Sequence, residues 1–115
     1  MRGETLKINE KINSNELICK KIKEHFLGNT YEVTMPYNQW TLRKSLTHCV
    51  LVKKNAWNAT CIEIDSKKGV VDVFSVIPNS SLDAVFRRQL GVLGMLLLEP
   101  SWKILRKEVV TALMK

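Results

Sequence analysis

The fold is decided by residues 46–98, which read LTHCVLVKKNAWNATCIEIDSKKGVVDVFSVIPNSSLDAVFRRQLGVLGMLLL. Three parts of this stretch, residues 46–53, 59–65 and 70–77, are rich in β-branched side chains, which is typical of strands. The segments between them have the length of hairpin connections, so we predict an antiparallel meander. Pro78 ends the last strand because proline has no N–H to donate to a neighbouring strand.

The two faces of this predicted meander differ in polarity, because side chains alternate between faces along a strand. One face is mainly apolar and predicts a core. The second face is only half polar, since it carries Cys49, Leu51, Cys61, Val70, Phe74 and Val76. A solvated face of an antiparallel sheet is normally polar. We therefore expect another helix, or a second copy of the protein, to cover part of this face.

A helix is predicted after the meander, over residues 79–98. Its start is marked by the capping residues Asn79, Ser80 and Ser81. Apolar residues at helical spacing form one stripe, made of Leu82, Phe86, Leu90, Leu93 and Leu97. The opposite side ends in Gly91, Met95 and Leu98. A helix that is apolar all round is expected to be buried on every side.

The rest of the chain adds shorter elements. Residues 1–12 are mostly polar and predict a flexible lead-in, followed by one domain over residues 13–115. Asn13 and Glu16 form a capping pair for a helix. The remaining elements are that helix, a short strand and a final helix, at residues 14–27, 31–36 and from 102 onward. Pro100 separates the last two helices, since proline is tolerated only in a helix's first turn. The predicted class is α+β: an N-terminal helix, an antiparallel meander of three to five strands and two C-terminal helices.

Composition bounds the function without naming it. The chain has 115 residues, 45% of them hydrophobic and 25% charged, which is ordinary for a globular domain. Its three cysteines, Cys19, Cys49 and Cys61, are an odd number and follow no signal peptide. We therefore expect free, buried thiols and a cytoplasmic location. A disulfide between Cys49 and Cys61 is a minor alternative, open if the hairpin is centred near Asn55.

No motif in the sequence predicts catalysis. There is no phosphate-binding glycine loop, no nucleophile elbow and no metal-ligand spacing. His48 is adjacent to Cys49, and neighbours on a strand point to opposite faces, which argues against a dyad. Three acids, Glu63, Asp65 and Asp72, are interpreted as a solvated patch. We expect no enzyme activity, no cofactor and no metal, and we identify no small-molecule substrate.

The net charge of +7 comes from basic residues spread along the chain, many of them in pairs. Nucleic-acid binding is therefore the alternative function, with Lys53, Lys54, Arg87 and Arg88 as candidate phosphate contacts. Residues 90–98 are apolar, but a membrane span needs about 20 such residues. A peripheral membrane contact stays open and is not favoured; it would place Arg87, Arg88, Lys103, Arg106 and Lys107 at the headgroups.

The leading hypothesis is a small non-enzymatic protein-interaction domain that forms a homodimer. The predicted contact surface is the second sheet face together with the Gly91 side of the apolar helix. Its residues are Leu51, Phe74, Val76, Gly91, Met95 and Leu98.

Overall fold

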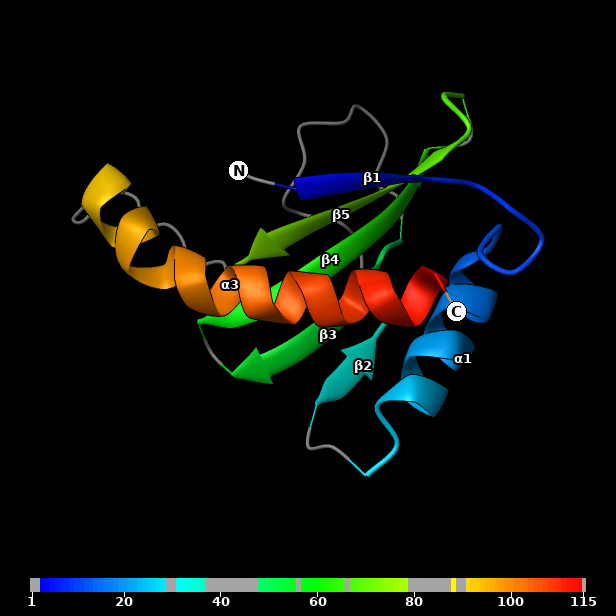
Figure 1. Cartoon of the computed structure of the whole chain (residues 1–115), viewed down its shortest axis with the longest axis horizontal. Helices are drawn as coiled ribbons and strands as arrows, with labels where there is room; N and C mark the ends of the chain where they lie inside the picture. The colour runs from blue at the N-terminus through cyan, green and yellow to red at the C-terminus, as the bar shows by residue number, and fades with distance from the viewer. Residues whose placement is uncertain are drawn as a thin grey trace.

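The computed structural model describes residues 3–28, 31–36, 48–55, 57–65, 67–78, 88 and 91–114. These residues contain five strands and two helices (Figure 1). In chain order they are β1 (Gly3–Lys7), α1 (Asn15–His25), β2 (Glu32–Thr34), β3 (Val50–Asn55), β4 (Asn58–Asp65), β5 (Val70–Val76) and α3 (Gly91–Met114). The predicted α+β class and N-terminal helix are confirmed.

The five strands form one antiparallel sheet in the order β1-β5-β4-β3-β2. The predicted meander is confirmed as β3, β4 and β5, and the predicted strand over residues 31–36 is β2. Residues 46 and 47, the start of the first predicted strand, lie outside the described residues. Central β4 pairs with β3 and β5 along most of its length, so the sheet is built around it.

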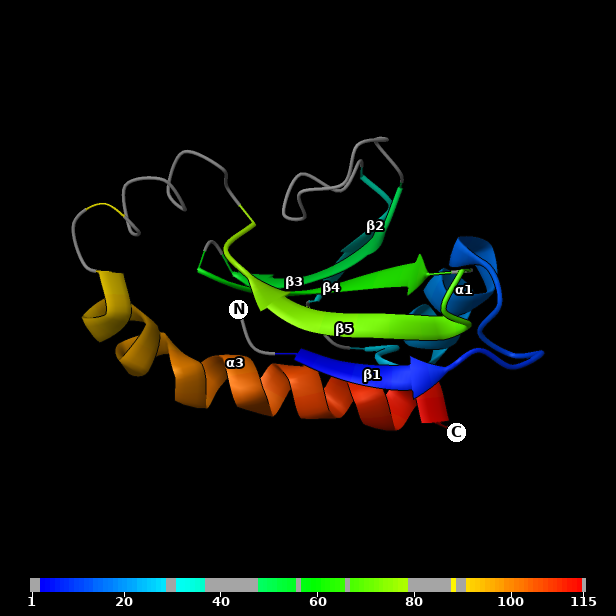
Figure 2. The same cartoon turned by 90° about the horizontal axis from the view of Figure 1, so that it is seen from above.

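Both helices pack against the same face of the sheet. Figure 2 shows α3 running along this face. The core between sheet and helices joins three sets of apolar side chains. The sheet contributes Val50, Val52, Ile62, Val71 and Val73, α1 contributes Ile18 and Ile22, and α3 contributes Leu105, Val109 and Leu113. Burial of these side chains accounts for the packing of α1 and α3 on this face.

The second face of the sheet carries a separate buried cluster. Cys49, Leu51, Ala59, Cys61 and Val76 are at most 6% exposed in a single copy. We expected part of this face to be covered, and these five residues are buried without a second copy of the protein. Leu51 and Val76, two residues of the predicted dimer contact, therefore have little exposed surface.

Residues 3–7 form a strand where the sequence predicted a flexible lead-in. β1 pairs with β5 at the edge of the sheet, with Gly3 opposite Phe74. A Cβ at Gly3 would lie 2.7 Å from the Val73 carbonyl oxygen, so this close approach requires glycine. Leu6 and Ile8 pack against the core, and Ile12 is buried in it. These contacts explain why the segment is ordered.

The described residues contain one C-terminal helix, and the prediction of two is wrong. α3 runs through Pro100 without a break. Pro100 and Leu96, the residue whose carbonyl loses its hydrogen bond, are both exposed, so this loss falls on the solvent side of the helix. The buried residues that follow, from Trp102 onward, hold the helix on the sheet. The predicted start of the apolar helix, residues 79–90, lies outside the described residues except for Arg88, which is helical.

The N-terminus of α1 is capped by Ser14. The Ser14 hydroxyl accepts a hydrogen bond from the Leu17 N–H at 3.2 Å, so the cap lies one residue after the predicted Asn13. The described helix, Asn15–His25, otherwise confirms the prediction of a helix over residues 14–27.

A tyrosine–carboxylate hydrogen bond joins the start of β2 to α3 and predicts a pH dependence. The Tyr31 hydroxyl donates to Glu108 Oε2 at 3.2 Å. Partial burial and the negative Glu108 carboxylate raise the pKa of Tyr31 above its usual value of 10.0. The protonated phenol is therefore favoured in the folded state. Its contribution to stability is full below about pH 10 and is lost as the pH rises through the higher folded pKa.

We expect Tyr31→Phe to lower the free energy of unfolding at pH 7 by about 1 kcal/mol, because one partly exposed hydrogen bond is lost. The variant should also lose less stability than the wild type between about pH 9 and pH 11. Urea unfolding at both pH values measures this. Equal alkaline losses in the two proteins would show that Tyr31 does not carry the effect.

Candidate interaction surface

α3 has one buried side and one exposed apolar side. The buried side carries Leu105, Val109 and Leu113 against the sheet. On the other side Leu93, Leu96, Leu97 and Ile104 are 64%, 64%, 68% and 58% exposed. Pro100, also exposed, lies between them. We call Leu93, Leu96, Leu97, Pro100 and Ile104 the outer stripe.

Helical spacing places the outer stripe on one face. Residues three, four or seven apart in a helix share a side, and successive members of the stripe differ by one to four positions. Beyond Ile104 the same face turns polar, with Lys107 and Thr111, and Lys103 lies at its flank. The apolar area therefore ends at a basic border.

The outer stripe also lies where α3 leaves the sheet. In Figures 1 and 2 the first turns of α3 extend past the ends of the strands. Four large side chains that are more than half exposed make a patch on the order of 400 Å². This is within the range of about 300–600 Å² for the largest apolar patch on a typical single-chain protein, and such patches are often functional. Scattered exposed leucines would need no explanation, but a contiguous row does.

Directional hydrogen bonds fix which side of α3 faces outward. Trp102 Nε1 donates to the Trp57 carbonyl oxygen at 2.9 Å. Asn58 Nδ2 donates to the Ser101 carbonyl oxygen at 3.2 Å. Both acceptor and donor on the sheet side belong to the β3–β4 turn and the start of β4. Because these bonds need one rotation of the helix, they hold the outer stripe toward solvent.

A buried arginine strengthens the same attachment. Arg106 Nη1 donates to Ser75 Oγ on β5 at 2.9 Å. Its Nη2 lies 3.4 Å from Glu99 Oε1, one end of an ion pair within α3. The membrane alternative grouped Arg106 with Lys103 and Lys107 as a headgroup contact, but Arg106 is 6% exposed. The reason is the length of the arginine side chain, which reaches inward to β5.

The structure does not bring the predicted contact residues together on one accessible surface. Leu51 and Val76 are buried within one copy, and Phe74 is half-buried against them. Leu98 is half-buried against Ile77 and Trp102. The burial of Gly91 and of the Met95 side chain lies outside what the structure describes. Leu51 and Val76 therefore offer little area to a second copy, whereas the outer stripe offers much.

The candidate phosphate contacts are dispersed. Lys53 and Lys54 lie at the end of β3, Arg88 is exposed, and Arg87 lies outside the described residues. Another exposed pair, Lys67–Lys68, follows the opposite end of β4. A continuous basic stripe joining these pairs would have to follow the whole of β4, most of which is buried. Nucleic-acid contact by these residues stays a prediction.

The titratable residues on the second face are arranged for burial and not for nucleophilic chemistry. Cys61 is paired with Leu51, and its diagonal neighbour is Cys49, so the two cysteines are not directly opposite. A hydrogen bond to Cys49, burial and the nearby Glu63 raise the pKa of the Cys61 thiol. A thiol held protonated is a poor nucleophile. Glu63 and Asp65 are buried, unlike the predicted solvated patch, because this sheet face is buried in one copy.

Two other observations bear on catalysis. His48 is exposed, and its Nδ1 is 2.9 Å from the Met35 carbonyl oxygen. Among the described residues, no group of three or more His, Cys, Asp or Glu side chains could hold a metal ion.

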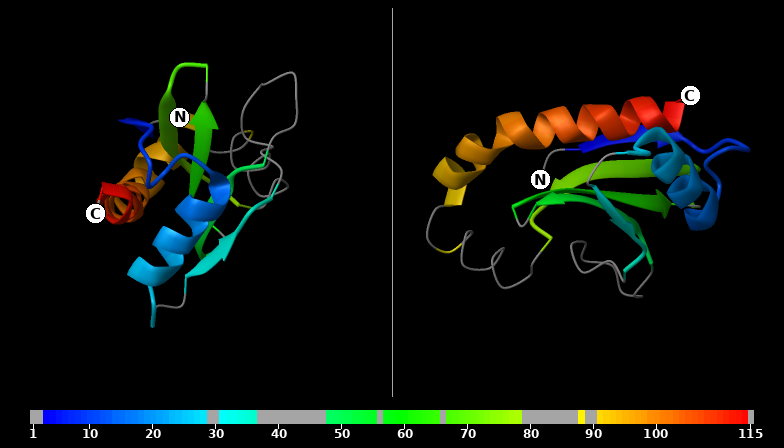
Figure 3. Two further views of the ribbon diagram at one scale, coloured as in Figure 1. Left: turned by 90° about the vertical axis from the view of Figure 1, so that its right-hand side faces the viewer. Right: turned by 90° about the horizontal axis from the view of Figure 1, so that it is seen from below.

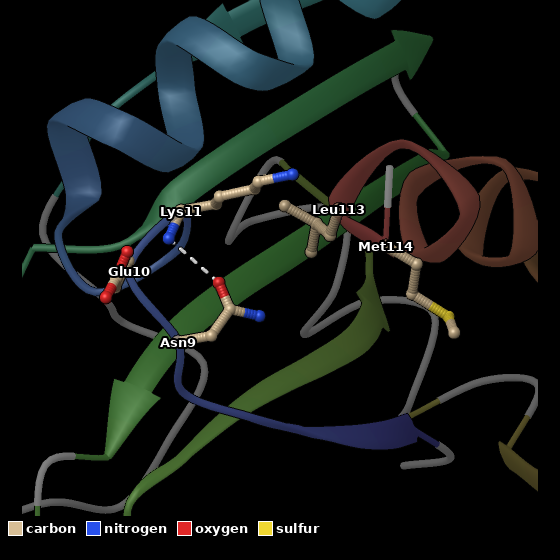
Figure 4. A pocket seen from close by; sticks show the side chains of 5 residues that line it. All are labelled: Asn9, Glu10, Lys11, Leu113 and Met114. Atoms are coloured by element: carbon tan, nitrogen blue, oxygen red, sulfur yellow. Dashed lines mark hydrogen bonds between the residues drawn. The ribbon is translucent and has the colours of Figure 1, made fainter.

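An open pocket of about 460 Å³ lies between the loop after β1 and the end of α3. It is lined by Asn9, Glu10, Lys11, Leu113 and Met114 (Figure 4). Asn9 Oδ1 accepts a hydrogen bond from the Lys11 N–H at 2.8 Å, which shapes the loop. The polar groups do not converge on one point as they do in ligand sites.

Comparison with known proteins does not assign a family, since no protein-family model, no curated protein and no solved structure matches the chain. In the described residues, no helix combines the length and hydropathy needed to cross a membrane. The outer stripe is therefore the feature on which a function can be argued. The sequence contains a signal for the outer stripe: residues 93, 97, 100 and 104 recur at helical spacing if one helix continues through Pro100.

Proposed function

We propose that the protein is a small, non-enzymatic interaction domain that self-associates through the outer stripe of α3. The observation that supports this is the exposure of four large apolar side chains in one row, on a helix whose other side is anchored to the sheet. Exposed apolar area of this size is costly in water and is removed when two such rows meet.

A second copy fits the chemistry of the stripe. Its centre is uncharged, and Lys103 and Lys107 lie at its border, which is the arrangement of an interface with an apolar centre and a polar rim. A standard interface buries about 800 Å² on each partner, and the stripe supplies on the order of half of it. The neighbouring exposed residues Ser101 and Thr111 extend the area.

Other partners fit this surface less well. Nucleic acid requires lysine and arginine at the contact centre, where the stripe has leucines and a proline. A lipid surface would use Arg106 at the headgroups, yet Arg106 is turned inward to Ser75 and Glu99.

The net charge of +7 opposes self-association at low salt.

The expected result is a concentration-dependent dimer in light scattering or sedimentation, detectable at about 50 µM or below for a weak interface. Leu97→Lys should raise the dissociation constant roughly 100-fold, because one substitution removes a buried leucine from both protomers and adds repulsion. The matched control is Leu27→Lys, which makes the same charge change at a leucine that is 87% exposed outside the stripe.

Salt separates this proposal from its alternatives. Screening of the positive charge should strengthen the dimer between about 50 and 500 mM salt, whereas oligonucleotide binding should weaken steeply. A monomer at all accessible concentrations would overturn the proposal, as would equal effects of Leu97→Lys and Leu27→Lys. Salt-sensitive binding to oligonucleotides or anionic vesicles by a protein that stays monomeric would also overturn it.

A further inference from the structure

The outer stripe has a direction, and this determines how two copies can meet. Its apolar members run from Leu93 to Ile104, and the same face turns basic and polar at Lys107 and Thr111. A symmetric pair of helices must therefore bring either like ends together or opposite ends together. The two arrangements differ in where the lysines lie.

Resting on self-association through the outer stripe, we propose that two α3 helices pair antiparallel, with the two-fold axis passing between Leu97 and Pro100. The midpoint of the stripe, halfway between residues 93 and 104, lies at this position. Leu93 of one protomer then faces Ile104 of its partner, and Leu97 faces Pro100. Leu96 faces Ser101, so four of the five members of the outer stripe have an apolar counterpart.

Charge favours this arrangement over the parallel one. In a parallel pair Lys103 lies beside Lys103 and Lys107 beside Lys107, and like charges in contact are destabilising. In the antiparallel pair the two Lys107 residues are separated by seventeen residues' rise, roughly 25 Å. The two Lys103 residues are separated by roughly 14 Å. Both separations exceed the screening length of about 8 Å at physiological salt.

The helix dipoles add to the same preference. Parallel pairing places two positive N-termini side by side, and the antiparallel pair sets each dipole against the opposite direction of the other. In a protein that already carries a charge of +7, an arrangement that brings no further positive ends together is the less costly one. Figure 3 shows the start of α3 extending past the ends of the strands.

Single cysteines test the register, and the native cysteines are suited to this because Cys19, Cys49 and Cys61 are all buried. We compare Leu93→Cys, Ile104→Cys and an equimolar mixture of the two under copper–phenanthroline oxidation, on non-reducing gels. In the antiparallel pair the two copies of residue 104 lie roughly 16 Å apart along the axis, as do the two copies of residue 93. A disulfide needs Cα atoms within about 7 Å, so neither variant should link to itself.

The mixture should give the cross-linked dimer in at least tenfold greater yield than either variant alone. Leu27→Cys, an exposed site outside the stripe, sets the background of random collision. Efficient self-linking of Ile104→Cys alone would mean parallel pairing; it would overturn the register and leave self-association standing. Background yield in every sample, with a dimer still present by light scattering, would overturn both the register and the stripe as the contact. A monomer by light scattering would overturn the proposed function itself.

Discussion

Trp102→Ala is expected to lower the free energy of unfolding by about 4 kcal/mol, the middle of the range for removing a buried aromatic side chain. Trp102 is 5% exposed and packs against Ile77, with Leu98 beside it. Its indole N–H also satisfies the Trp57 carbonyl oxygen at 2.9 Å. The alanine variant therefore leaves a cavity and a partly buried acceptor without its donor.

Two variants separate these contributions in urea unfolding followed by circular dichroism. Trp102→Phe keeps most of the ring volume and loses the hydrogen bond, so it should cost about 1.5 kcal/mol. Trp57→Ala removes a side chain that is 41% exposed and keeps the backbone acceptor, so it should cost less than Trp102→Ala by about 2 kcal/mol. Equal costs for all three would mean that Trp102 does not anchor α3.

The central strands were predictable because the pattern of apolar and polar side chains along them matches their burial in the sheet. Along β4, Ile62 and Cys61 face opposite sides and both are buried, which matches a strand with two covered faces. β1 was not predictable in this way. Its sequence GETLK has one large apolar residue, and the backbone pairing with β5 that orders it leaves no mark on the pattern. The requirement for glycine at position 3 follows only from the structure, in which Phe74 lies opposite Gly3.

The outer stripe was missed because Pro100 was expected to end a helix. If Pro100 separates two helices, the second helix does not determine which side of the first helix faces the sheet. Leu93 and Leu97 were therefore assigned to the core. With one helix the phase is set by the buried Trp102 and Leu105, and stepping back by helical spacing brings Leu98 to the inner side. The exposed position of Leu93 and Leu97 then follows from geometry.

The polar attachments of α3 could not be predicted from the sequence, since they join residues far apart in the chain. The Arg106–Ser75 hydrogen bond spans 31 positions, and the Asn58–Ser101 bond spans 43. Lys103 and Lys107, the nearest lysines in the sequence, are exposed, so the sequence gives no sign that Arg106 is buried. Only the position of β5 beneath α3 shows that this arginine is internal.

Arg106→Met is the second large effect that we expect, a loss of about 3 kcal/mol in the free energy of unfolding. Methionine fills most of the space, so the cost comes from the groups that arginine satisfied. Ser75 Oγ, which is buried, loses a charged donor at 2.9 Å, and the Glu99 carboxylate loses its cation at 3.4 Å. Glu99 keeps about a fifth of its side chain in solvent, which limits the penalty on its side.

A double-mutant cycle with Glu99→Gln isolates the ion pair. Glu99→Gln alone should cost about 1 kcal/mol, and adding it to Arg106→Met should cost almost nothing, because the carboxylate has already lost its partner. Additive costs would show that the two side chains do not interact. Since Arg106 holds α3 from its inner side and does not touch the outer stripe, Arg106→Met should dimerise with the wild-type dissociation constant wherever it is folded. A large change in that constant would mean that the stripe is displayed correctly only when β5 and α3 are joined by this arginine.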